Sequence, residues 1–223
     1  MRNRPHLRQS PHAHERNCGA VCIRMLYKGH QLDGPAVGNI FKDVREEIFP
    51  GIWSCRNHRM LQFFHNRNVP ACMIYAITKD NFYKILDHCD SEDLDVILNH
   101  RIAPSESEGH CTVYLGRDDQ GIHISDPNME KQSHRYSFDE YETLAMKDPS
   151  FNEIVEDYSM LIVNLTDAPR DMVTISCEDN ALNISEQVQI FDFLKNYNVR
   201  TLLPISDWRI EVNWSNRTGK VIR

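Results

Sequence analysis

The sequence predicts an α+β protein of 223 residues, and two segments carry most of that prediction. The first segment begins at Cys18 and reads CGAVCIRMLYKG, with apolar residues on nearly all sides of a helix. This is typical of a buried helix, and Gly29 is a natural end for it. The second segment reads GHCTVYLGRDDQGIHISDP and contains apolar strands over 110–115 and 121–126 around a polar turn. This pattern predicts an antiparallel hairpin.

The other expected elements follow from shorter patterns. Helices are expected at four further places, over 35–44, 57–66, 79–89 and 137–146. The last of these starts with a capping box formed by Ser137 and Glu140. Strands are expected over 71–77, 95–100 and 160–165.

A change of pattern at Ala168-Pro169 marks a possible domain boundary. The tail beyond it is expected to fold as β-α-β-β, with elements over 172–177, 185–197, 199–203 and 208–214. We therefore divide the chain into an N-terminal arm (1–17), a main domain (18–167) and a small α/β C-terminal extension (168–223).

Composition and charge narrow the possible functions. Hydrophobic residues make up 41% of the chain and are spread throughout it, so the chain can bury a sizeable core. No segment resembles a signal peptide, and no apolar run approaches the ~20 residues that cross a bilayer. Seven cysteines, an odd number without a framework spacing, favour a reducing compartment. The net charge of −7 argues against nucleic-acid binding. Together with the features above, it leads us to expect a cytoplasmic protein that binds neither nucleic acid nor membranes.

Cys18 stands where a polar arm meets the buried helix. A helix N-terminus carries a partial positive charge, which favours a thiolate over a thiol. Gly19 beside it allows backbone and substrate to approach closely. A reactive cysteine and a small core residue are both consistent with this position. Cys22, one turn later on the inward face, is interpreted as a core residue.

The predicted hairpin brings a histidine and an aspartate close together. If opposing residue numbers sum to 236, His110 lies opposite Asp126, at a Cβ separation of ~4.5–5.5 Å that allows a hydrogen bond. A carboxylate there fixes the imidazole tautomer and stabilises the imidazolium. A register one residue away pairs Val113 with Ile124 instead, so the register stays open. The competing interpretation is a surface histidine and an aspartate that starts a turn before Pro127.

Three blocks, CGAVCIRML, GHCTVYLG and HISDP, occur in an order that resembles the cysteine, histidine and aspartate blocks of the bacteriocin-processing (double-glycine) peptidases and their stand-alone relatives. The stretch GIWSCRNHRMLQFFHNRNVPA is more faintly similar to a eukaryotic branch named for a guanylyl cyclase domain. The resemblance covers 9–165 and implies a papain-like cysteine peptidase fold, in which a nucleophile helix packs on an antiparallel sheet. It makes 18–167 the peptidase domain.

The resemblance also implies roles for individual residues. Cys18 attacks a carbonyl carbon and forms an acyl-enzyme, His110 takes the thiol proton and protonates the leaving amine, and Asp126 holds His110. Relatives usually carry a glutamine six residues before the cysteine, where its amide helps to form the oxyanion hole, but this sequence has His12 there. Gln9 is the only nearby glutamine, so the hole is formed by Gln9, by His12 or His14, or is degraded. Losing one such donor costs ~10²–10³ in rate.

Three functions are compatible with these residues. The leading hypothesis is a cysteine peptidase-like hydrolase, a thiol protease that cleaves a peptide or amide bond of a peptide or protein substrate without a cofactor or metal. A glutamine deamidase, an amidase or a transpeptidase uses the same triad and thioester. A non-catalytic papain-fold module that binds peptides or interaction partners is supported by the displaced glutamine.

Several other features are interpreted as structural. His12-x-His14 with Cys18 and Cys22 matches no tight zinc spacing. Cys111 is expected to point to the opposite strand face from His110 and to pack there. The acidic cluster within 87–95 is expected to be a solvated surface. Surface positions are expected for His58, His65, His88 and His100.

Overall fold

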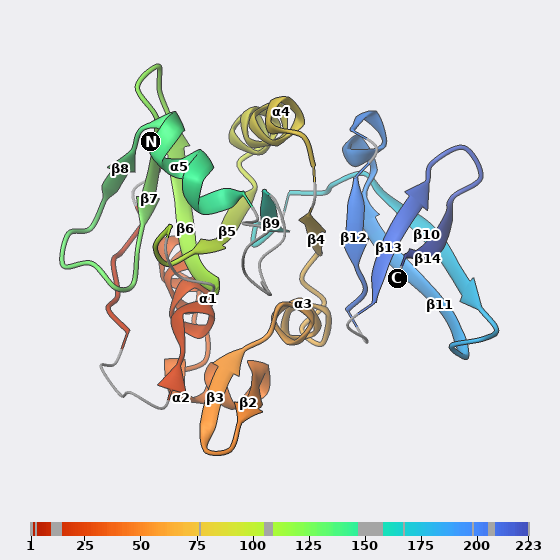
Figure 1. Cartoon of the computed structure of the whole chain (residues 1–223), viewed down its shortest axis with the longest axis horizontal. Coiled ribbons are helices and arrows are strands. Elements are labelled where there is room, and N and C mark those ends of the chain that lie inside the picture. Colours follow the sequence, from red (N-terminus) through yellow and green to blue (C-terminus); the bar gives the residue numbers. More distant parts are fainter. Residues whose placement is uncertain are drawn as a thin grey trace.

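The computed structural model describes residues 2, 4–9, 15–75, 77–104, 109–146, 158–166, 168–197, 199–204 and 208–222. In this part of the chain, one large sheet contains the strands β4 (Ala71–Tyr75), β5 (Asp95–Arg101), β6 (Gly109–Arg117), β7 (Ile122–Ser125), β8 (His134–Tyr136), β9 (Ser159–Val163), β10 (Met172–Asp179), β11 (Ile184–Phe191), β12 (Arg200–Leu202), β13 (Arg209–Asn213) and β14 (Thr218–Ile222). Their order across the sheet is β11-β10-β14-β13-β12-β4-β9-β5-β6-β7-β8 (Figure 1). Neighbouring strands are antiparallel, except that β10 and β14 run parallel.

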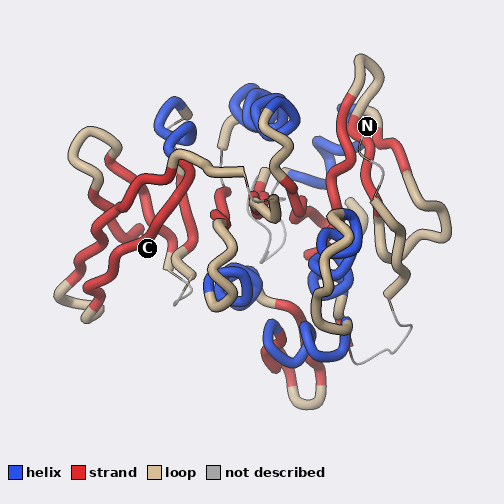
Figure 2. Tube along the Cα trace, turned by 180° about the vertical axis from the view of Figure 1, so that it is seen from behind, coloured by secondary structure: helices blue, strands red, loops and turns tan. Residues whose placement is uncertain are grey.

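Helices cover both faces of this sheet (Figures 1 and 2). One face carries α1 (Cys18–Gly29), α2 (Val37–Val44) and α3 (Asn57–His65), and the other carries α4 (Lys79–Ser91) and α5 (Phe138–Ala145). In β5, Ile97 belongs to the core under α1–α3, whereas Leu98 belongs to the core under α4 and α5. Strands buried on both faces appear in the sequence as continuous apolar runs, which is why β4, β5 and β9 could be predicted but their faces could not.

The expected helices over 57–66, 79–89 and 137–146 correspond to α3, α4 and α5, and the capping box of Ser137 and Glu140 is present. A small sheet that was not predicted lies beside α1. Its strands are β1 (Glu15–Arg16), β2 (Arg45–Phe49) and β3 (Ile52–Cys55), with β3 in the middle. No helix in the described part of the chain is both long enough and apolar enough to cross a membrane.

The strand β3 makes close contact with the start of α1. A Cβ atom added to Gly19 would lie 2.6 Å from Met60 Sδ and 2.9 Å from Cys55 Cβ. A glycine is therefore required at this position by the packing of α1 against β3 and α3, in addition to any approach of substrate. The same contact places Cys55 next to the N-terminus of α1.

The β6–β7 hairpin forms, but neither predicted register is correct. Val113 pairs with Ser125 and Tyr114 with Ile124, so opposing numbers sum to 238 and not to 236. A bulge then shifts the register, and Gly116 pairs with His123. Gly116 has a φ of 140°, which favours glycine at this bulge. A shift of two residues keeps each side chain on its predicted face, because the side-chain period of a strand is two.

The N-terminal arm is anchored on the acidic cluster within 87–95, which was expected to be solvated. Arg2 lies 3.2 Å from Asp90, and the guanidinium of Arg4 pairs with Asp95. Asp95 is only 1% exposed and also accepts a hydrogen bond from His30 at 2.6 Å. The expectation of a solvated surface is therefore wrong for Asp95, because the guanidinium of Arg4 compensates its buried charge and His30 adds a hydrogen bond.

The region after 168 continues the large sheet. β12 pairs with β4, with Thr201 opposite Ile74. Side chains of β10, β11 and β13 belong to the same hydrophobic core as α4. The expected helix over 185–197 is wrong, because residues 184–191 form β11, and only a 3-10 turn over Asp192–Asn196 follows. The tail is therefore not β-α-β-β: five strands and this turn make up its described part.

We expect removal of 168–223 to prevent stable folding of the rest. The deletion exposes the backbone edge of β4, and it uncovers apolar residues of the core shared with α4. The truncated chain should aggregate or lose its cooperative thermal transition, which size-exclusion chromatography and circular dichroism would detect. A monomeric truncated chain with an unchanged melting temperature would show instead that the extension is an independent domain.

Candidate active site

Cys18 is the first residue of α1 and is 8% exposed. The residue before it, Asn17, makes no side-chain capping hydrogen bond to the helix. The pKa of the Cys18 thiol is lowered well below the ordinary value, first by a hydrogen bond with the Cys111 side chain. Burial opposes this shift, whereas a hydrogen bond with His110 and the charge of His110 lower the pKa further. The position therefore favours a thiolate.

His110 and Asp126 come together at the end of the β6–β7 hairpin. His110 Nε2 lies 2.7 Å from Asp126 Oδ1, and both side chains are almost completely buried. Continuing the observed register places Asp126 diagonally from His110 on the same face of the sheet, where the two side chains still reach one another. The backbone N–H of Asn128 donates to the same carboxylate oxygen at 2.7 Å, which fixes its orientation.

These contacts set the charges of the pair. Burial lowers the pKa of His110, but the hydrogen bond with Asp126 and then the contacts with Cys18 outweigh it and raise the pKa to about 10. Burial raises the pKa of the Asp126 carboxyl, but hydrogen bonds from His110 and the Asn128 backbone keep it below its usual value. These shifts favour a protonated His110 beside an ionised Asp126.

A second histidine lies beside His110. His100 was expected at the surface, but it is 1% exposed and its ring centroid lies 5.6 Å from that of His110. Burial and then the charge of His110 lower the pKa of His100 to about 4. Its ring nitrogens lie 2.6 Å from the Arg101 carbonyl oxygen and 3.2 Å from Thr112 Oγ1, which suits a neutral imidazole that donates once and accepts once.

Two cysteines near Cys18 were not recognised from the sequence as part of the site. α1 packs on the face of β6 that presents Cys111, so Cys111 lies beside Cys18 in addition to packing in the core. Cys22 was correctly placed in the core and donates to the Cys111 carbonyl oxygen at 3.3 Å. Burial raises the pKa of the Cys55 thiol, as does the charge of Cys18. Cys18 is thus the thiol of this group that is set up to ionise.

The arm brings one oxyanion candidate near the site. The backbone N–H of Gln9 donates to the Pro127 carbonyl oxygen at 2.9 Å, next to Asp126. The Gln9 side-chain oxygen is buried and has no hydrogen-bond partner among the described residues. His12 and His14 lie outside the residues that the structure describes.

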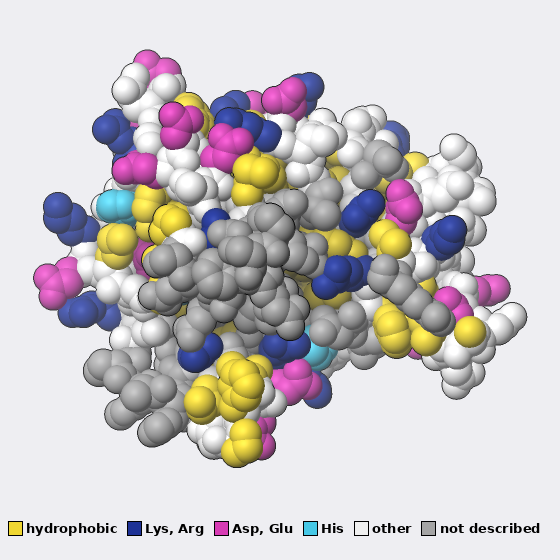
Figure 3. All heavy atoms as spheres, viewed as in Figure 1, with side chains coloured by type: hydrophobic (Ala, Val, Ile, Leu, Met, Phe, Trp, Pro, Cys, Tyr) yellow, Lys and Arg dark blue, Asp and Glu magenta, His cyan; other side chains and the backbone are white. Residues whose placement is uncertain are grey.

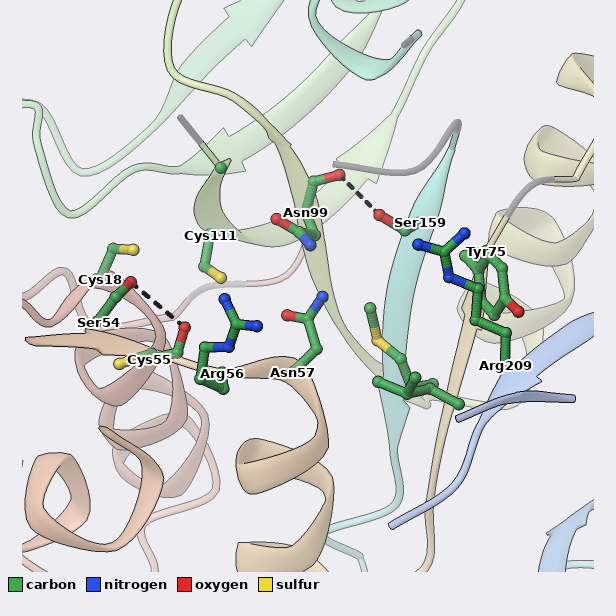
Figure 4. A pocket seen from close by; sticks show the side chains of 13 residues that line it. Cys18, Ser54, Cys55, Arg56, Asn57, Tyr75, Asn99, Cys111, Ser159 and Arg209 are labelled. Atoms are coloured by element: carbon green, nitrogen blue, oxygen red, sulfur yellow. Dashed lines mark hydrogen bonds between the residues drawn. The ribbon is translucent and has the colours of Figure 1, made fainter. Parts of the chain in front are cut away.

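A cavity of about 230 Å³, which we call the Cys18 pocket, opens beside the nucleophile candidate. Figure 4 shows Cys18, Cys55 and Cys111 at one side of it and Arg209 of β13 at the other. The floor and walls come from α3, β4, β5, β9 and β12. Among the described residues, no group of three or more His, Cys, Asp or Glu side chains is placed to hold a metal ion.

Comparison with known proteins relates this fold to peptidases. No model of a protein family and no curated protein sequence matches the chain. A crystal structure of a putative C39-like peptidase from Bacillus anthracis matches with a TM-score of 0.54 and 12% identity, over 75% of this chain and 98% of that one. A double-glycine-motif protease from an AMS/PCAT transporter, solved with its leader peptide, matches with a TM-score of 0.49 and 14% identity, over 73% of this chain and 92% of that one. The fold is therefore similar to that of C39-like peptidases, while the fainter likeness to the guanylyl cyclase-named branch stays a prediction.

Proposed function

We propose that this chain is a cysteine hydrolase that cleaves a peptide or amide bond. Cys18 is the nucleophile, His110 is the general acid and base, and Asp126 orients His110. The observation that supports this most strongly is the 2.7 Å contact between Asp126 and His110, together with the lowering of the Cys18 pKa by Cys111 and His110. The fold likeness to a C39-like peptidase supports the same proposal.

The charges of the site suit a thiolate–imidazolium pair that exists before substrate binds. The pKa of Cys18 is lowered while that of His110 is raised to about 10, so the proton resides on the imidazole at neutral pH. Because Asp126 engages Nε2 of His110, Nδ1 is the nitrogen that exchanges protons with Cys18 and the substrate.

The reaction then follows two steps. Cys18 Sγ attacks the carbonyl carbon, and the imidazolium gives its proton to the leaving amine as the C–N bond breaks. The product is a thioester on Cys18 and a neutral His110. His110 next takes a proton from water, which attacks the thioester and releases the acid product. The thiolate–imidazolium pair is restored.

Gln9 is our candidate for the side-chain donor to the oxyanion. It is held beside Asp126 by its backbone hydrogen bond to Pro127, and the arm before it is anchored by Arg2 and Arg4. The buried side-chain oxygen of Gln9 shows that its amide lies against the protein. In this proposal the oxyanion hole uses a glutamine nine residues before the cysteine.

We expect iodoacetamide to alkylate Cys18 much faster than the other six cysteines at pH 6.5. The lowered pKa keeps Cys18 ionised as the pH falls, whereas burial raises the pKa of Cys22, Cys72 and Cys89. Peptide mapping by mass spectrometry, repeated from pH 5 to 9, gives the rate for each cysteine. The pH at which the alkylation rate of Cys18 is half-maximal should lie below ~8.5, the pKa of an ordinary thiol. Slow and uniform labelling would remove the chemical basis of the proposal.

Activity itself separates a hydrolase from a peptide-binding module. The protein is incubated with a complex mixture of peptides, and new termini are identified by mass spectrometry. A hydrolase produces new termini, and prior alkylation of Cys18 abolishes them. Peptides that bind without being cleaved, while Cys18 remains reactive, would favour the binding module.

A further inference from the structure

The nucleophile candidate shares its pocket with two other thiols. Cys18, Cys55 and Cys111 lie at the same side of the Cys18 pocket (Figure 4). They come from three different elements, α1, β3 and β6. All seven cysteines of the chain are free thiols in this structure. The hydrolysis proposed above uses only the sulfur of Cys18, so the two neighbouring thiols need a separate explanation.

Cys111 is the thiol that interacts most closely with Cys18. α1 packs against β6, and both side chains belong to the same hydrophobic core. The influence is reciprocal, because the Cys111 side chain is the first cause of the lowered pKa of Cys18, and the Cys18 side chain is the first cause of the raised pKa of Cys111. A thiolate nucleophile beside a protonated thiol is the arrangement of a redox-sensitive cysteine and its resolving partner.

The other two nearby thiols are engaged differently. Cys55 packs on Gly19, where an added Cβ atom would lie 2.9 Å from Cys55 Cβ and 3.3 Å from its Sγ. Cys22 lies one turn further along α1 and is fully buried, and its thiol donates to the Cys111 carbonyl oxygen at 3.3 Å. Among these thiols, Cys111 is therefore the best placed to react with an oxidised Cys18.

The strands that carry the two pocket thiols differ in their surroundings. β6 pairs with β5 on one side and β7 on the other, so the backbone at Cys111 is held inside the large sheet. Cys55 ends the β2–β3 hairpin, which lies at the edge of the molecule and carries exposed apolar side chains, with Phe49 63% exposed (Figure 3). A bond from Cys18 to Cys111 thus joins α1 to the strand on which it already packs.

A small oxidant can reach both sulfurs from the pocket. Cys18 is 8% exposed and Cys111 is 6% exposed, and both line the same cavity of about 230 Å³. Hydrogen peroxide is little larger than water and fits such a cavity. Peroxides oxidise accessible thiolates first, so Cys18 is the sulfur that reacts and Cys111 is the one that follows.

We propose that Cys111 is the resolving thiol of Cys18, so that hydrogen peroxide converts the pair into a reversible disulfide. The Cys18 thiolate attacks a peroxide oxygen and the O–O bond breaks, giving a sulfenic acid. The leaving hydroxide takes the proton of the His110 imidazolium and becomes water. Cys111 Sγ then attacks the sulfur of the sulfenic acid, and the hydroxyl group leaves with the Cys111 proton as a second water. The two sulfurs together lose the two electrons that the peroxide gains.

The disulfide has two consequences for the site. It removes the nucleophile, so the oxidised protein cannot form a thioester. It also protects Cys18 from further oxidation to a sulfinic acid, which thiols do not reverse. A dithiol such as dithiothreitol restores both cysteines by exchange. This inference goes beyond the proposed hydrolysis and requires only that Cys18 reacts with peroxide.

Peptide mapping of the intact protein tests the proposal directly. The reduced protein is treated with hydrogen peroxide, free thiols are blocked with N-ethylmaleimide, and trypsin then releases the pocket cysteines in separate peptides, 17–24, 46–56 and 102–117. We expect a cross-link between 17–24 and 102–117, which fragmentation assigns to Cys18 and which dithiothreitol removes. A cross-link from 17–24 to 46–56, or oxidation of Cys18 without any cross-link, would overturn the proposal.

Variants then show what the second thiol does. After excess peroxide, dithiothreitol should restore iodoacetamide labelling of Cys18 in the natural protein and in the matched control Cys55→Ala. In Cys111→Ala, most of the labelling should be lost permanently, and a sulfinic acid should appear on Cys18. Equal recovery in Cys111→Ala would contradict a resolving role. The peptide map of the natural protein decides the question even if Cys111→Ala folds poorly.

The same measurements separate this inference from the proposed function, because neither depends on a cleaved peptide. A reversible bond between Cys18 and Cys111 in a protein that cleaves no peptide would support the redox pair and count against the hydrolase. Peptide cleavage that depends on Cys18, without a peroxide-induced bond to Cys111, would contradict the redox pair alone.

Discussion

With Cys18 replaced by alanine, we expect peptide hydrolysis to fall by ~10⁴-fold or more, since removing the nucleophile of a catalytic triad leaves only the contribution of binding and the oxyanion hole. Cys18 is small and lies at the edge of its core with 8% exposure, so the fold should survive the change. The measurement is kcat/KM on a cleaved peptide, together with the melting temperature of the variant.

Cys72→Ala is the matched control for this prediction. Cys72 is also buried, but it lies in the core on the opposite face of the sheet, where its thiol contacts the Gln189 carbonyl oxygen at 3.8 Å. This variant should lose about 1 kcal/mol of stability and keep its activity. The reverse pattern, with activity lost in Cys72→Ala and kept in Cys18→Ala, would exclude Cys18 as the nucleophile.

The parts of the candidate site that depend on local sequence patterns could be predicted. The buried helix after Cys18 and the hairpin between His110 and Asp126 each lie within one short segment, where periodicity and turn residues suffice. The register of the hairpin could not be predicted, because it depends on the bulge near Gly116. The two side chains still meet, because the error was an even number of residues.

The extension shows where periodicity misleads. In ISEQVQIF, Ile184, Val188 and Phe191 follow a helical spacing, whereas Val188 and Ile190 follow a strand spacing. Pairing with β10 over the whole segment decides between the two, and Val188 and Ile190 point into the core. Such pairing with another strand is a tertiary effect that local propensity does not contain.

The Cys18 pocket lay beyond sequence reasoning for a different reason. Two of its lining residues, Arg56 and Arg209, lie far apart in the sequence and line one cavity only because β12 and β13 extend the sheet beside β4. Neither arginine is part of a local motif. Cys111 was assigned to packing for a similar reason, since the sequence did not show which face of β6 receives the start of α1.

Replacing Asp126 by asparagine is expected to lower kcat/KM by ~10³–10⁴-fold while the fold is retained, because an amide can occupy the same space but cannot stabilise the imidazolium. After the opposing effect of burial, the hydrogen bond with Asp126 is the largest influence on the pKa of His110, which is about 10. Without the carboxylate this pKa falls, so the imidazolium is lost at a lower pH.

The sign of the effect follows from the role of the proton. His110 must be protonated to release the leaving amine, so activity in the natural protein should decline only as the pH approaches about 10. In Asp126→Asn the decline should move to lower pH, as measured by kcat/KM against pH and by NMR titration of the imidazole. Asp118→Asn is the control, since Asp118 makes a similar 2.7 Å contact with His123 in the same hairpin but away from Cys18. If both variants behaved alike, or if the alkaline limb did not move, Asp126 would have no part in setting the charge of His110.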